Sequence, residues 1–65
     1  MELEEIKKIA TKFFELEFSK KYIFSEEEIE AFNIVTSNIK AEKKPKEELV
    51  NKLISAIKDC GEDIN

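Results

Sequence analysis

Hydrophobic residues recur at helical spacing in three separate windows of this chain. In the first window, residues 2–20, four of them share one helical face at steps of three and four residues: Leu3, Ile6, Ala10 and Phe13. All the apolar residues of the window together cover about 200° of the helix circumference, whereas a surface helix needs a stripe of about 100°. Phe14 and Phe18 account for one flank of this excess. Such a helix is either central in a bundle or also faces a second molecule, and the pattern leaves both open.

The second window opens with the sequence FSEEEI at residues 24–29. Ser25 can accept a hydrogen bond from the N–H of Glu28, whose carboxylate can reach back to the N–H of Ser25. This reciprocal pair is a capping box, and Phe24 packing on Ile29 would add a hydrophobic staple. We therefore predict a helix that begins directly after Ser25, with the preceding chain folded back to support the ring of Phe24.

Apolar periodicity continues through the second and third windows. Five residues form the inward face of the second helix: Ile29, Phe32, Val35, Thr36 and Ile39. Ile34 falls on the opposite side. In the third window Pro45 is expected as the first helical residue, where its missing N–H is not needed, and Gly61 as the left-handed cap at the end.

The segments between the windows complete the prediction. Lys20 and Lys21 suit the carboxyl end of the first helix, where cations meet exposed carbonyls. Residues 22–24 predict an extended linker packed on the core. We expect one all-α domain over residues 1–65, a small up-down-up three-helix bundle that homodimerisation would complete. Its helices are expected at about residues 2–20, 26–41 and 45–60.

Composition limits the chemistry that this chain can carry. A chain of 65 residues buries only about 60% of its unfolded surface, so the core must be efficient or completed by a partner. The chain has no histidine and a single cysteine, Cys60, which excludes an internal disulfide and argues against a metal site or a cofactor. Cys60 lies on the inward stripe near a helix carboxyl end, where a thiol is not activated, and is expected to act as a small core hydrophobe.

The net charge of −4 is unevenly placed. In an up-down-up bundle, three lysines and seven carboxylates would meet at one pole: Lys20, Lys21 and Lys58 against Glu26, Glu27, Glu28, Glu30, Asp59, Glu62 and Asp63. The remaining charges cancel, so the acidic excess belongs to this pole. It is either ordinary helix capping or an electronegative patch that steers a basic partner.

Several function classes are disfavoured by what the sequence lacks. Without histidine, and with carboxylates grouped at helix starts, it offers no acid–base pair, so we expect no enzyme and no small-molecule substrate. Every one of the eleven cations is a lysine, which disfavours nucleic-acid binding. No leader segment or long apolar run follows Met1, so we expect a cytoplasmic protein without a membrane association.

One short segment resembles a known family. Tyr22, Ser25, Glu28, Ile29 and Phe32 share their spacing with part of the Hha/YmoA nucleoid co-regulators, small helical proteins that bind a larger DNA-binding protein. The resemblance covers residues 22–32 and consists largely of the capping-box pattern. It assigns no functional residue to this chain.

The expected function is therefore protein–protein interaction. We predict a small acidic regulator, inhibitor or immunity-type protein that binds a larger protein or a second copy of itself. The predicted contact surface combines the aromatic flank with the acidic pole: Phe14, Phe18, Glu26, Glu27 and Glu30. The alternative is a small transcription regulator that touches DNA through its lysine-rich second connection: Lys40, Lys43, Lys44 and Lys46.

Overall fold

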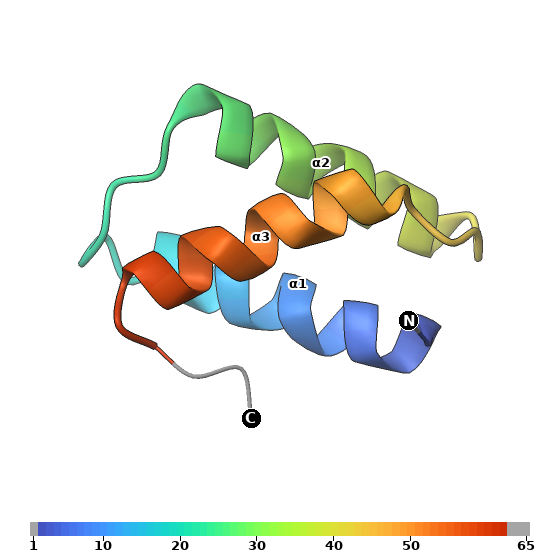
Figure 1. Ribbon diagram of the computed structural model, residues 1–65, viewed down its shortest axis with the longest axis horizontal. Coiled ribbons are helices and arrows are strands. Elements are labelled where there is room, and N and C mark those ends of the chain that lie inside the picture. Colours follow the sequence, from blue (N-terminus) through green and yellow to red (C-terminus); the bar gives the residue numbers. More distant parts are fainter. Residues whose placement is uncertain (1, 63–65) are drawn as a thin grey trace.

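The computed structural model describes residues 2–62, and within them it contains three helices and no strand (Figure 1). They are α1 (Leu3–Phe18), α2 (Glu26–Lys40) and α3 (Glu47–Asp59). Each end lies within two residues of its predicted position. Every helix packs on the other two, with α1 and α3 running in the same direction and α2 in the opposite one. The predicted all-α, up-down-up three-helix bundle is confirmed.

The core lies where the three apolar stripes meet. Its buried side chains come from every helix and from the first connection: Ile6, Ile9, Ala10, Phe13, Leu16, Phe24, Ala31, Val35, Val50, Leu53, Ala56 and Ile57. In α1 the buried set includes Ile9 and Leu16, so one flank of its wide apolar surface is used inside the bundle. The other flank is not.

The start of α2 follows the predicted capping box. The backbone N–H of Ser25 donates to the Glu28 carboxylate at 2.8 Å, and the N–H of Glu28 donates to the Ser25 hydroxyl at 3.3 Å. The ring of Phe24 stacks on Phe13 of α1, with centroids 4.3 Å apart. The first helix therefore folds back to support this ring, as the sequence predicted.

The prediction for the first connection is wrong at one residue. Tyr22 is half-buried and Phe24 is buried, but Ile23 between them is 99% exposed. Successive side chains of an extended segment point to opposite sides, so two inward neighbours force the residue between them outward.

Each of the three helices is followed, two positions after its last residue, by a residue in the left-handed region. Gly61 was the expected one and has φ +76°; its N–H donates to the Lys58 carbonyl at 2.9 Å, and the N–H of Glu62 donates to the Ile57 carbonyl at 3.3 Å. These two bonds make a Schellman cap. Lys20 (φ +59°) and Glu42 (φ +57°) adopt the same conformation without being glycine. Lys20 therefore lies beyond the end of α1 and not in its last turn, which corrects the prediction.

The start of α3 also differs from the prediction. Lys46 is the N-cap residue, and its carbonyl accepts the N–H groups of Leu49 and Val50 at 3.1 and 3.2 Å. Pro45 precedes the cap and is buried. The proline ring is therefore packed as an apolar residue before the helix, and does not serve as its first residue.

Candidate protein-binding face

Two large aromatic side chains of α1 remain in contact with solvent. Phe14 is 50% exposed and Phe18 is 77% exposed. Their ring centroids lie 6.0 Å apart, one helical turn from each other. Because the buried stripe of α1 is centred on Phe13, the next residue and the one a turn later fall on its outer flank. The sequence prediction that these rings lie outside the main stripe agrees with their position in the structure.

The exposed rings belong to a continuous stack that includes all five phenylalanines of the chain. Phe24 stacks on Phe13, and Phe13 stacks on Phe32 with centroids 5.1 Å apart. The ring centroids of Phe32 and Phe14 lie 6.4 Å apart, and the ring of Phe14 stacks in turn with that of Phe18. The stack leads from the buried centre of the bundle to its surface, so the outer rings rest on a rigid base.

A shallow groove between α1 and α2 adjoins these rings. Four residues from each helix line it: Lys7, Ala10, Thr11 and Phe14 from α1, and Phe32, Thr36, Ile39 and Lys40 from α2. The two helices are antiparallel (Figure 1), so the early α1 residue Lys7 and the late α2 residue Lys40 belong to one end of the groove, and Phe14 and Phe32 to the other. We call Phe14, Phe18 and this groove the aromatic face.

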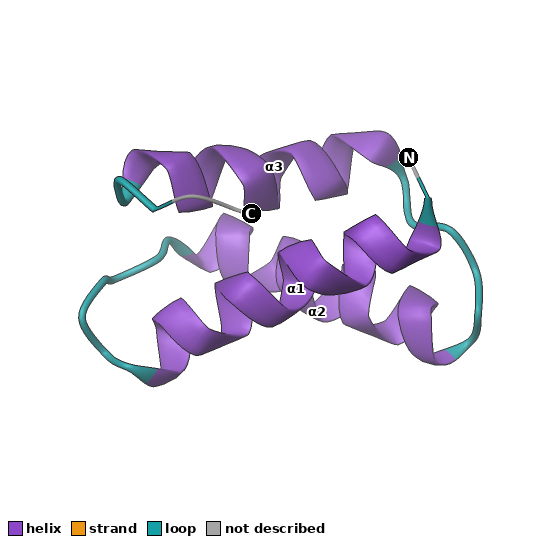
Figure 2. Ribbon diagram, turned by 90° about the horizontal axis from the view of Figure 1, so that it is seen from below, coloured by secondary structure: helices purple, strands orange, loops and turns teal. Residues whose placement is uncertain are grey.

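The predicted inward stripe of α2 is only partly enclosed near the groove. Ile39 packs against the core as predicted, but both Ile39 and Thr36 are half-buried and line the groove. The cause is the arrangement of the helices, since α1 and α2 contact each other less extensively than either contacts α3 and cross at an angle (Figure 2). Among the described residues, the buried hydroxyl of Thr36 has no hydrogen-bond partner.

The structure separates the predicted acidic residues. Glu27 lines a different groove, between α2 and α3, whose other residues include Glu28, Glu48 and Lys52. Glu26 and Glu30 are exposed on α2. Phe14 and Phe18 lie next to each other, whereas Glu27 lies on another side of the bundle, away from both rings.

The predicted DNA-contacting lysines are also divided. Lys40 ends α2 and lines the apolar groove beside Lys7. Lys43, Lys44 and Lys46 are exposed in the connection between α2 and α3. The sequence did not predict that Lys7 and Lys40 line the same groove, because they belong to different helices and the antiparallel packing alone brings them to it.

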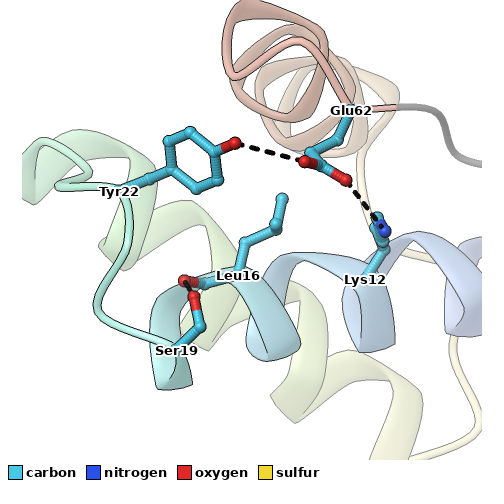
Figure 3. Close-up of polar contacts among 5 residues, drawn as sticks. All are labelled: Lys12, Leu16, Ser19, Tyr22 and Glu62. Atoms are coloured by element: carbon cyan, nitrogen blue, oxygen red, sulfur yellow. Dashed lines mark hydrogen bonds and ion pairs between the residues drawn. The ribbon is translucent and has the colours of Figure 1, made fainter.

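On the other side of α1, a polar cluster ties the end of α3 to the rest of the bundle (Figure 3). The Tyr22 hydroxyl donates to the Glu62 carboxylate at 3.1 Å, and the Lys12 ammonium lies 3.3 Å from the same carboxylate. The two contacts with Lys12 and Tyr22 hold the pKa of Glu62 below its ordinary value. Burial, followed by the contact with Glu62, raises the pKa of Tyr22.

Cys60 is half-buried against the core, and burial, together with the charges of Glu28 and Asp59, raises the pKa of its thiol. A raised pKa keeps the thiol protonated and unreactive near neutral pH. Asp63, one of the seven carboxylates assigned to the acidic pole, lies outside the described residues.

No family model, curated protein or solved structure matches this chain. The likeness of residues 22–32 to the Hha/YmoA proteins thus has no support from these comparisons. Within residues 2–62, no helix is long and apolar enough to cross a membrane, and no three potential metal ligands come together.

Proposed function

We propose that this chain is a non-catalytic protein–protein interaction module that binds through its aromatic face. The observation that supports this most strongly is the exposure of Phe14 and Phe18 on a bundle whose core is already filled by other residues. A regulatory, inhibitory or immunity-type role suits a small chain of this kind, by analogy of class.

The energetics favour a protein partner for this face. Burying a large apolar side chain stabilises a complex by about 1.5–3 kcal/mol, and exposed aromatic rings in a cluster are typical anchors of protein interfaces. The stack through Phe32 to Phe13 holds the outer rings in place before binding. Rings that are already fixed lose little conformational entropy on binding.

The groove adds specificity to this surface. Its apolar floor accepts hydrophobic side chains, and Lys7 and Lys40 favour an acidic group at one end. The preferred ligand is therefore a protein surface with aromatic or aliphatic side chains next to a carboxylate.

Site-specific photo-cross-linking in the native host tests this proposal. A benzophenone side chain replaces Phe18, and a matched control places it at Asn51, which is exposed on α3 and away from the aromatic face. We expect a protein cross-link from position 18 that disappears when Phe14 is also changed to Ser, and none from position 51. Absence of a cross-link from position 18, or equal products from both positions, would refute the proposal.

A further inference from the structure

We propose that the occupant of the aromatic face is a second copy of this chain, docked antiparallel across a two-fold axis. This inference rests on the proposed function and identifies its partner. Its basis is a match in shape along α1 and a match in charge along α2, and the two share one centre.

The complementarity in shape lies along α1. The groove includes Ala10, one turn before Phe14, whereas the protruding ring of Phe18 lies one turn after it. A two-fold axis that crosses α1 at Phe14 exchanges these two positions. Each Phe18 ring then faces the small Ala10 side chain at the groove of the other copy, and the two Phe14 rings meet at the axis.

The complementarity in charge lies along α2. Glu26 begins the helix and Lys40 ends it. They are separated by fourteen positions, close to four turns of about 3.6 residues, so the exposed Glu26 lies within about 40° of Lys40 around the helix axis. Their midpoint is Asn33. An axis that crosses α2 there places Glu26 of each copy opposite Lys40 of the other.

The two centres coincide in space. Phe14 of α1 contacts Phe32 of α2, the neighbour of Asn33, at 6.4 Å between ring centroids. A single axis can therefore pass both helices at their respective midpoints. The position midway between Ala10 and Phe18 on α1 thus lies beside the position midway between Glu26 and Lys40 on α2. This agreement supports one antiparallel arrangement in which α1 faces α1 and α2 faces α2.

The available surface is sufficient for such a dimer. A stable interface of standard size buries about 800 Å² on each partner. The chain exposes 4774 Å² in total, of which this is about one sixth. The α1–α2 surface is one of the three sides of the bundle and can supply that area.

Charge reversal tests the arrangement, because Glu26 and Lys40 of one copy are about 21 Å apart along α2 and cannot contact each other. Glu26→Lys and Lys40→Glu should each weaken the dimer about tenfold or more, since the symmetry applies each change twice. Glu27→Lys, also in the first turn but on the α2–α3 side, and Lys44→Glu, in the connection, are matched controls that should dimerise normally.

Mixing gives the decisive result. An equimolar mixture of Glu26→Lys and Lys40→Glu should form a heterodimer as stable as the wild-type dimer, measured by sedimentation equilibrium, because both contacts then join opposite charges. A wild-type dimer whose strength ignores these changes, or a mixture that stays dissociated, overturns the arrangement. A wild type that is a single chain at every concentration overturns self-docking, and a cross-link from position 18 to another protein would then leave the proposed function standing.

Discussion

The two sides of α1 differ in how completely their neighbouring side chains are buried. Toward α3, α1 packs on side chains that are almost completely buried: Val50, Leu53, Ala56 and Ile57. The Tyr22–Glu62–Lys12 cluster ties the end of α3 to α1. Beside α2, the aromatic face leaves two phenylalanines exposed, and the Thr36 hydroxyl has no hydrogen-bond partner within residues 2–62. The first side buries its large apolar side chains, and the second leaves two of them exposed.

This difference follows from how wide each apolar stripe is. The apolar residues of α3 occupy a single stripe, and the other two helices bury its centre: Val50, Leu53, Ala56 and Ile57. Those of α1 form a wider surface, and two neighbouring helices cannot enclose all of it. The excess remains at the surface as two stacked rings, and this exposed apolar surface is the basis of the proposed binding role.

Substitution of Phe13 should destabilise the fold far more than substitution of Phe18. Phe13 is fully buried between Phe24 and Phe32, so Phe13→Ala should cost about 3–5 kcal/mol of unfolding free energy. A loss of that size approaches the whole stability of a small domain. Phe18→Ala should change the stability of the single chain by less than about 0.5 kcal/mol. Urea denaturation followed by circular dichroism in dilute solution measures both, and equal losses would place Phe18 in the core.

A smaller effect is expected at the cap of α3. Gly61 has φ +76°, and a Cβ at this position would meet no atom within 4 Å. Gly61→Ala should therefore cost about 1 kcal/mol through backbone conformation alone. Ser55→Ala, at an exposed position inside α3, is the control and should be neutral or slightly stabilising. Thermal unfolding compares the two variants; an unchanged midpoint for Gly61→Ala would show that the cap does not hold the helix end.

Loss of the Glu62 carboxylate should have the smallest effect on stability, and this effect should depend on pH. Lys12 and Tyr22 hold the pKa of Glu62 below its ordinary value of 4.5, so the charged form is favoured in the folded chain. The resulting stabilisation is present above pH 4.5 and is lost as the pH falls through the lowered pKa. Glu62→Gln should be less stable than the wild type at neutral pH, and the difference should close in acid. Glu42→Gln, in an exposed connection, is the control, and a difference that persists in acid would contradict the account.

Local rules in the sequence predicted the start of α2 correctly, because the Ser25–Glu28 pair and its helix form from adjacent residues. They also placed Phe14 and Phe18 on the outer flank of α1. Other features depend on contacts between distant segments. The Glu62 cluster joins residues forty or more positions apart, and the left-handed Lys20 and Glu42 carry no glycine to announce them. The crossing of α1 and α2 beside the groove leaves no local signal either.

The central claim is that the outer rings of α1 are exposed in the single chain and covered by protein when it associates. Phe18→Trp tests this directly, because the chain contains no other tryptophan. We predict emission typical of a water-exposed indole in dilute solution, and a shift to shorter wavelength as the protein concentration rises. Emission that is already that of a buried indole in dilute solution would contradict the account, and emission that stays unchanged at every concentration would contradict self-docking.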